Sequence, residues 1–390
     1  MRMTKKGWKA TWLCGALALC LLAAGCSQPG SGAATGTSAE TGGAASAGAT
    51  AGTGGKAVGF IFVGTKDDYG YNQAAYIGSE AVEKAFPDLK VLRAENVPET
   101  AEAERVMEQM IKDGAKIIFP TSYGHLDPAL NVAKRHPDVV FYHQGGLKTA
   151  ANLGTYFGTI WEPVYLAGVA AGKMSKTGKL GYIVSVPIPQ VLLNVNAFEM
   201  GAKSVNPQAK TSVVFTGSWC DPGQQANAAN SLIDGGADVL SQHQDCTKTI
   251  IETAERRGAM SVGYHADAAS LAPKGWIAGS VWNWSDLYVD MVKTAVDGKF
   301  AGSKYDGKYR GTMADGIVQL TDFGASVPDD VKQFVEQKKK ELMSGTLKPF
   351  LGPVKDQSGA VRVPEGQSPT IEELEASDYL IEGVIGNIPK

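Results

Sequence analysis

Short apolar runs alternate with amphipathic stretches along most of the chain from Lys56 onward. The runs AVGFIFVG, AKIIFPTS and KLGYIVSVP are rich in Val, Ile and Phe, whereas segments such as NQAAYIGSEAVEKAF space their apolar residues with the period of a helix. Nearly continuous apolar strands that alternate with helices are typical of parallel sheets covered on both faces. The pattern therefore predicts an α/β protein.

These alternating segments form two series, which cover about residues 56–158 and 179–282. We expect two doubly wound parallel-sheet lobes joined by a multi-strand hinge. Ligands of such sheets bind beyond the carboxyl ends of the strands, so a cleft between the lobes is the expected site. The predicted boundaries are residues 56–160 plus about 284–320 for lobe 1 and residues 161–283 plus about 321–390 for lobe 2.

Residues 1–25 have the pattern of a lipoprotein signal peptide. A basic start precedes ATWLCGALALCLLAAGC, an apolar segment that is too short for a typical membrane span. The segment ends in LLAAGC, which resembles a bacterial lipobox, so Cys26 is the expected lipidated N-terminus. A cleaved secretory peptide and an uncleaved anchor are the alternatives. Residues 26–55 have almost no charge and no large apolar side chain, which predicts a flexible tether.

The charge of the chain argues against a nucleic-acid partner. The full sequence has 37 Lys and Arg, 40 Asp and Glu, and a formal net charge of −3. Loss of the predicted signal peptide removes four positive charges and leaves a net charge of −7. A mildly acidic protein with no basic run lacks the electrostatic pattern of nucleic-acid binding.

Five cysteines occur in the sequence, and three of them lie in or directly after the predicted signal peptide. Cys220 and Cys246 remain in the expected folded part. Exported proteins can form disulfides, so this even remainder suggests one bridge. Two separate buried thiols are the alternative.

Polar and aromatic residues are concentrated directly after the apolar runs. The segments TKDDYGYN, TSYGHLD, GSWCDP, QHQDCT, YHADA and WNW each follow one of them. A planar ligand could stack on the aromatic rings and form hydrogen bonds with the amides and carboxylates. The strand ends therefore predict a small-molecule site.

Catalytic and cofactor motifs are absent from the sequence. It contains no nucleophile elbow, no phosphate-binding loop and no dinucleotide fingerprint after a strand. Two weaker alternatives are a metal ion and an acid/base pair, in which Asp68 would act with another carboxylate. A membrane tether favours a binding protein over a hydrolase. We therefore expect no cofactor, no metal and no enzymatic activity. In the metal alternative named above, the ion would be bound by His243, Asp245, His265 and Asp267.

Several motifs resemble the basic membrane lipoprotein family of PnrA-like proteins. They include DYGYN after the first strand, AKRHPDVVF, EPVYLAGVAAGKMSKTGKLGYI, GADV, SVGYHAD and PFLGPVKDQSG, in this order along nearly the whole chain after Lys56. The resemblance implies a type I periplasmic binding protein of an ABC importer, which holds a purine nucleoside between aromatic rings in the interlobe cleft. It also implies that Asp68, Tyr71 and Asn72 line this cleft.

The chain departs from the family pattern at two positions. Nucleoside-binding members generally have G-x-D-x-D and later S-V-V-K, in which the first Asp and the Lys hold the ribose. The matching segments here are GYHAD and SVWN, so that His265 and Asn283 take these places and Asp267 keeps its acid. The tryptophans of this chain would make the pocket smaller and flatter. We therefore expect a free purine base, adenine first, rather than a nucleoside.

The predicted ligand-binding residues combine the strand ends with this resemblance. They are Asp68, Tyr71, Asn72, Tyr123, Trp161, Trp219, Asp245, His265, Asp267, Trp282 and Asn283. The predicted function is that of a monomeric, lipid-anchored protein at the extracytoplasmic face of the membrane, which delivers a purine base to an ABC permease. A purine nucleoside-binding protein of the same class is the main alternative, and a periplasmic nucleoside-cleaving enzyme is less favoured.

Overall fold

The computed structural model describes residues 50–389 of the chain. The predicted signal peptide, the lipidation at Cys26 and most of the predicted tether lie outside these residues. The six residues from Thr50 to Gly55 were assigned to the tether, but they pack on the first lobe. The N–H of Gly52 donates to the carbonyl oxygen of Asp138 at 3.0 Å, and a Cβ on Gly52 would lie 2.9 Å from the carbonyl oxygen of Ala295. Small residues allow this close backbone approach.

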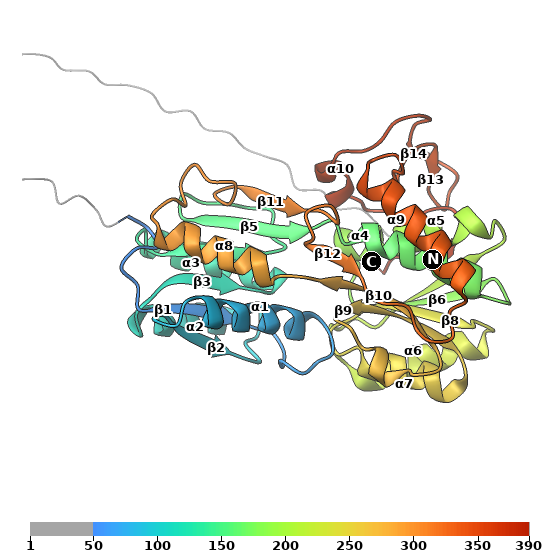
Figure 1. The fold of residues 1–390 in the computed structure, drawn as a ribbon, viewed down its shortest axis with the longest axis horizontal. Coiled ribbons are helices and arrows are strands. Elements are labelled where there is room, and N and C mark those ends of the chain that lie inside the picture. The colour runs from blue at the N-terminus through green and yellow to red at the C-terminus, as the bar shows by residue number, and fades with distance from the viewer. Residues whose placement is uncertain (1–49, 390) are drawn as a thin grey trace, which may run out of the picture. The chain divides into compact units, whose positions relative to one another are not determined.

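The first sheet contains six parallel strands in the spatial order β11-β5-β4-β3-β1-β2 (Figure 1). Strands β1, β4 and β5 are buried along their whole length, as expected for mainly apolar strands of a parallel sheet. The strand bounds are Lys308–Gly311 (β11), Leu153–Gly158 (β5), Val140–Gln144 (β4), Ala115–Pro120 (β3), Ala57–Ile61 (β1) and Lys90–Ala94 (β2).

The second sheet contains seven strands in the order β12-β10-β9-β8-β6-β7-β15. Strand β12 is antiparallel to β10, and the other neighbours are parallel. Its central order β7-β6-β8-β9-β10 repeats the order β2-β1-β3-β4-β5 of the first sheet, so both lobes are doubly wound in the same way. The bounds are Val318–Leu320 (β12), Trp276–Trp282 (β10), Met260–His265 (β9), Val239–His243 (β8), Lys179–Val184 (β6), Lys210–Phe215 (β7) and Val384–Ile385 (β15).

Helices connect the strands and cover both faces of the sheets. In the first lobe α1 packs beside α8, and in the second α4 packs against α5 (Figure 1). The start of α2 shows how the sequence sets such an element: Thr100 accepts a hydrogen bond from the N–H of Glu102, and acidic residues occupy the first turn. The helix bounds are Tyr71–Ala85 (α1), Ala101–Lys112 (α2), Leu126–Arg135 (α3), Trp161–Met174 (α4), Pro189–Val205 (α5), Pro222–Asp234 (α6), Lys248–Arg257 (α7), Ser285–Val296 (α8), Asp329–Met343 (α9) and Ile371–Glu375 (α10).

The chain crosses between the two sheets three times, at residues 159–160, 283–284 and 312–317. Backbone hydrogen bonds join these segments: the N–H of Thr159 donates to Gly311 and that of Asn283 donates to Ile317, each at 2.9 Å. The last crossing ends before β12, which pairs with β10 in the second sheet. Residues 318–320, which the sequence analysis assigned to lobe 1, therefore belong to the sheet of lobe 2.

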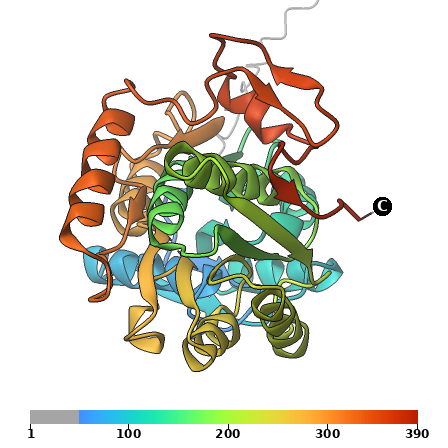
Figure 2. The ribbon, with the colours of Figure 1, turned by 90° about the vertical axis from the view of Figure 1, so that its right-hand side faces the viewer.

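The C-terminal part adds a small sheet of β13 (Val354–Lys355) and β14 (Val361–Val363). Figure 2 shows this segment in red above α5, against which α10 packs. Arg310 of β11 forms an ion pair with Glu375 of α10, and both side chains are buried, so the C-terminal part is bound to the first sheet as well. No helix within residues 50–389 combines the length and apolarity needed to span a bilayer.

Candidate ligand-binding site

A cavity lies between the carboxyl ends of the strands of the two sheets. Both lobes contribute to its wall. The lining residues are Tyr71, Ser122, Tyr123 and Phe157 from lobe 1 and Gln190, Trp219, His243, Asp245 and His265 from lobe 2. The cavity is small and is lined from both lobes, so it suits a small ligand.

The strand order explains where the cavity lies. In a doubly wound sheet, the loops diverge where the strand order reverses, which is between β1 and β3 in lobe 1 and between β6 and β8 in lobe 2. Tyr71 and Tyr123 follow β1 and β3, whereas Gln190 and Asp245 follow β6 and β8. Both switch points therefore open into the same cavity.

The loop before α1 is built around the carboxylate of Asp68. Its Oδ1 accepts hydrogen bonds from the N–H groups of Gly70 (2.8 Å) and Gln73 (3.0 Å), and its Oδ2 accepts from the N–H (3.0 Å) and the side-chain amide (2.8 Å) of Asn72. The carbonyl oxygen of the Asn72 side chain accepts from the N–H of Gly64 at 3.1 Å. Burial nevertheless raises the pKa of Asp68. Asp68 and Asn72 thus shape the loop and the start of α1.

This loop also contacts lobe 2 directly. Thr247 donates from its hydroxyl to the carbonyl oxygen of Tyr69 at 2.7 Å and from its N–H to that of Asp68 at 3.2 Å. A Cβ on Gly70 would lie only 2.0 Å from the carbonyl oxygen of Asp245. Only glycine allows this approach, so the contact between the lobes depends on Gly70.

Asp245 is a buried carboxyl group in the wall of the cavity, with 6% of its surface exposed. Burial raises the pKa of Asp245 well above its usual range, and the nearby carboxyl groups of Asp68 and Glu99 raise it further. A ligand N–H group would favour the charged form, because a carboxylate accepts a strong hydrogen bond. Asp245 is thus suited to hold a donor on the ligand.

A disulfide between Cys220 and Cys246 connects two loops of lobe 2. The loop after β7 contains Trp219, and the loop after β8 contains Asp245. The N–H of Asp245 also donates to the carbonyl oxygen of Trp219 at 2.9 Å. The disulfide and this hydrogen bond hold an aromatic ring and a carboxyl group together at one side of the cavity.

His265 ends β9 in an unusual backbone conformation, with φ of 73°. Left-handed backbone at a residue other than glycine costs about 1–3 kcal/mol and is often found at functional sites. The indole N–H of Trp282 donates to His265 Nδ1 at 2.8 Å. Burial, aided by the neighbouring His243, lowers the pKa of His265 well below its usual range, so the ring is neutral.

His243 is the last residue of β8 and a second neutral imidazole in the wall. Burial lowers the pKa of His243 to about 3. The side-chain amide of Asn194 lies 3.0 Å from His243 Nδ1, and the ring of Trp219 is tilted toward the imidazole with the ring centres 6.0 Å apart. The site therefore has no charged imidazole at neutral pH, which suits an uncharged ligand.

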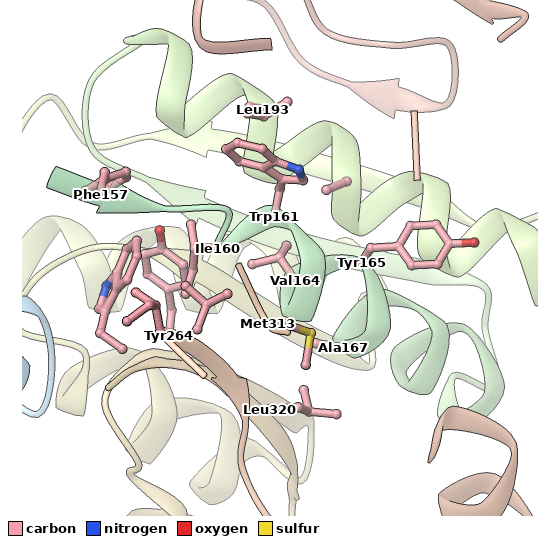
Figure 3. Close-up of a cluster of buried hydrophobic side chains, with 14 of the residues drawn as sticks. Phe157, Ile160, Trp161, Val164, Tyr165, Ala167, Leu193, Tyr264, Met313 and Leu320 are labelled. Carbon is pink, nitrogen blue, oxygen red and sulfur yellow. The ribbon is translucent and has the colours of Figure 1, made fainter. Parts of the chain in front are cut away.

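Five of the predicted ligand-binding residues line the cavity: Tyr71, Tyr123, Trp219, Asp245 and His265. The other six lie elsewhere. Asp68 and Asn72 hold the loop, Trp161 lies beside Leu193 in the hydrophobic core (Figure 3), and Trp282 lies behind His265.

Asp267 and Asn283 also lie outside the cavity, whereas His265, which takes the other expected ribose-clamp position, lines it. Asp267 is exposed and accepts a hydrogen bond from the N–H of Ala269 at 2.9 Å. Asn283 donates to the carbonyl oxygen of Gly316 at 3.2 Å. Both line a second cavity, and His265 is the residue that this second cavity shares with the first.

Sequence reasoning did not assign four lining residues to ligand binding: Ser122, Phe157, Gln190 and His243. It named His243 only for the metal alternative. Phe157 and His243 lie within the last residues of β5 and β8 rather than after them. Ser122 and Gln190 follow strands but have ordinary polar side chains. All four residues lie at or after the end of a strand, and this position was the sequence signal that could have identified them. No cluster of three or more His, Cys, Asp or Glu side chains suited to a metal ion occurs within residues 50–389.

Proteins of a known family resemble this chain over most of its length. The family model described as ABC transporter substrate-binding protein PnrA-like matches residues 56–351. A purine-binding protein of Brucella abortus is 38% identical over 334 residues, which cover 85% of this chain and 94% of that protein. A protein of Haloferax volcanii, named as an ABC transporter glucose-binding protein, is 31% identical over 330 residues, which cover 85% of this chain and 80% of that protein.

Solved structures show the same fold. An ABC transporter solute-binding protein of Aeropyrum pernix superposes with a TM-score of 0.63 at 19% sequence identity. The superposition covers 83% of this chain and 98% of that protein. The two-lobed α/β architecture is therefore shared with this solute-binding protein.

Proposed function

Because the chain belongs to the PnrA-like family of ABC transporter substrate-binding proteins, we propose that it binds a free purine base, adenine first, and delivers it to an ABC permease. The observation behind this proposal is the pairing of Asp245 and His265 in one narrow cavity with aromatic walls. A purine base has N–H donors and unprotonated ring nitrogens along its edge, and its faces can stack on aromatic rings.

The position of the polar groups favours a base over a nucleoside. A ribose would need partners for its hydroxyl groups, and each hydroxyl group buried without one costs about 1–3 kcal/mol. Of the two expected ribose-clamp positions, His265 has no carboxylate and Asn283 forms its hydrogen bond outside the cavity. Asp267, which keeps its acid, also accepts its hydrogen bond outside the cavity. His265 also lies between the cavity and the space that these two residues line.

The name of the Brucella abortus relative supports a purine ligand, whereas that of the Haloferax volcanii relative points to a sugar. The cavity favours the purine. Four of its nine lining residues carry rings other than histidine, namely Tyr71, Tyr123, Phe157 and Trp219. The flat face of a purine can stack on such rings.

The N-terminal sequence supports a carrier that acts outside the cytoplasm. The lipobox-like LLAAGC and the Gly- and Ala-rich residues after it would anchor the protein through Cys26 and let it reach the permease. We propose that it acts there as a monomer and without a cofactor.

Calorimetric titration tests the ligand. The protein is unfolded and refolded to remove bound ligand and then titrated with adenine, guanine, hypoxanthine, adenosine, inosine and glucose. We expect one adenine per chain and weaker binding of adenosine and inosine. Tighter binding of a nucleoside would support the nucleoside carrier, and binding of glucose alone would overturn the purine proposal. Release of free base from adenosine or inosine, followed by chromatography, would instead indicate the nucleoside-cleaving enzyme.

A further inference from the structure

Trp282 and His265 form a buried hydrogen-bonded pair at the ends of β10 and β9. At most 6% of either residue is exposed. An indole N–H can only donate, so His265 Nδ1 must be the acceptor. A neutral imidazole has one donor and one acceptor nitrogen, so the proton of His265 is on Nε2. The direction of one hydrogen bond thereby determines the tautomer.

Neighbouring rings hold His265 in place. The ring centres of Tyr264 and Tyr71 lie 3.9 Å and 5.0 Å from that of His265, and the Tyr71 contact is edge-on. His265 lines the cavity, and its Nε2 is buried without a hydrogen-bond partner among the described residues. A buried N–H of this kind is rare in folded proteins and calls for an acceptor.

We propose that Trp282 is a positioning residue of the ligand site, which fixes the tautomer of His265 so that Nε2–H selects a ligand with an unprotonated acceptor, such as a purine ring nitrogen. This inference rests on the proposed function and specifies it, because it assigns an acceptor on the purine to His265 and leaves the donor to Asp245. Trp282 acts through His265 and is absent from the cavity wall. Burial supports the same reading, since it lowers the pKa of His265 and keeps the ring neutral.

The tautomer can be measured without any ligand. The five histidines of the chain are labelled with ¹⁵N, and long-range ¹H–¹⁵N spectra of the refolded protein report which ring nitrogen is protonated. The variant His265→Gln assigns the signal. We expect His265 as the Nε2–H tautomer in the unmodified protein and a mixture of tautomers in Trp282→Phe, which keeps an aromatic ring but removes the donor. A His265 protonated at Nδ1 in the unmodified protein would overturn the proposal.

A matched control is available in Trp284. Its ring stacks on Trp282 with centres 4.7 Å apart, it is equally buried, and its Nε1 has no partner among residues 50–389. Trp284→Phe therefore makes the same chemical change in the same stack without removing a hydrogen bond. We expect the tautomer of His265 to stay unchanged in Trp284→Phe. Equal changes of the tautomer in both variants would mean that packing, rather than the Trp282 hydrogen bond, sets it.

Deaza analogues connect the tautomer to the ligand. In 1-, 3- and 7-deazaadenine one ring nitrogen at a time becomes C–H and can no longer accept. In the unmodified protein we expect one analogue to bind about tenfold more weakly than adenine, and in Trp282→Phe we expect this ratio to fall to about threefold or less. A full tenfold ratio in Trp282→Phe would overturn the role of Trp282. Failure of every purine to bind would refute the proposed function, while the spectra would still decide the tautomer.

Discussion

The two sides of the cavity use their polar residues in opposite ways. In lobe 1 the carboxylate of Asp68 and the amide of Asn72 form hydrogen bonds within their own loop. In lobe 2 the carboxyl group of Asp245 is buried in the cavity wall and His265 Nε2 has no partner among the described residues. Lobe 1 therefore provides a rigid frame and aromatic faces, and lobe 2 provides the groups that can distinguish one ligand from another.

This difference shows why residue type alone does not identify a binding residue. Asp68 and Asp245 are both buried aspartates beside the same cleft, and burial raises the pKa of each. Four hydrogen bonds from the protein satisfy Asp68. Asp245 instead lines the cavity, where an N–H group of a ligand can reach it.

The strongest test of the comparison replaces Gly70, a residue of lobe 1 that contacts lobe 2. In Gly70→Ala the new Cβ would lie 2.0 Å from the carbonyl oxygen of Asp245, so the lobes cannot approach as they do in this structure. We expect the affinity for adenine to fall at least about 1,000-fold, or about 4 kcal/mol, in calorimetric titration.

The matched control for Gly70→Ala is Gly307→Ala, because nothing lies within 4 Å of a Cβ at Gly307. We expect this variant to bind adenine like the unmodified protein. Unchanged affinity in Gly70→Ala would show that binding does not require this contact between the lobes.

Replacing Asp68 tests the role assigned to lobe 1. Asp68→Ala leaves three backbone N–H groups and the Asn72 amide without their acceptor, so we expect the free energy of unfolding to fall by about 2–3 kcal/mol. Urea denaturation of the ligand-free protein measures this loss. Full stability with weakened adenine binding would reverse the assignment and make Asp68 a ligand contact.

Replacing Asp245 tests the role assigned to lobe 2. Asp245→Asn keeps the shape of the side chain but removes the charge that a ligand N–H would favour, so we expect adenine to bind about thirtyfold more weakly. The ligand-free variant should be at least as stable as the unmodified protein at pH 7, because Asn cannot take up a buried charge. Wild-type affinity in Asp245→Asn would contradict the role of Asp245 in binding.

Asp245→Asn should also change how the free energy of unfolding depends on pH. The pKa of Asp245 is higher in the folded protein than in the unfolded chain. Its contribution to stability is therefore complete below the unfolded pKa of about 4 and is lost as the pH rises through the raised folded pKa. Urea denaturation at several pH values should show this loss in the unmodified protein, and the difference between the two proteins should disappear in acid.

The smallest expected effect concerns the ligand itself. Adenine should bind at least about tenfold more tightly than adenosine, a difference of about 1.4 kcal/mol. His265→Gly removes the ring shared by the two cavities and suits the left-handed backbone at this position. We expect the ratio to fall to about threefold in this variant. Tighter binding of adenosine by the unmodified protein would return the proposal to a nucleoside carrier.

The alternation of apolar and amphipathic segments was sufficient to predict two doubly wound lobes, because buried parallel strands have a distinctive continuous apolar sequence. Structural features that involve only a few residues were harder to predict. The antiparallel strand β12 has three residues, and the folded role of Thr50–Gly55 depends on close backbone contacts that composition does not reveal.

The site was predicted less completely than the fold. Among the residues predicted from strand-end position and from the family resemblance, Tyr71, Asp245 and His265 lie in the cavity wall. These signals could not distinguish Asp68, whose partners come from its own loop, or Trp161, which turns into the core. The direction of a side chain and the partners already available to it depend on the tertiary structure. These two properties explain why Asp68 and Trp161 do not line the cavity.

The hydrogen bonds from Thr247 to Asp68 and Tyr69 have a further consequence for transport. They join protein to protein, so they stabilise the arrangement in which the two lobes meet, here called the closed form, whether or not a ligand is bound. The ligand then has to supply only the remaining free energy of closure. A permease that recognised closure alone would also accept empty carriers and consume ATP without import. Stronger hydrogen bonds would raise the affinity for the ligand, but they would also raise the fraction of empty carriers that look loaded to the permease. The strength of these few bonds is therefore a compromise between the two effects.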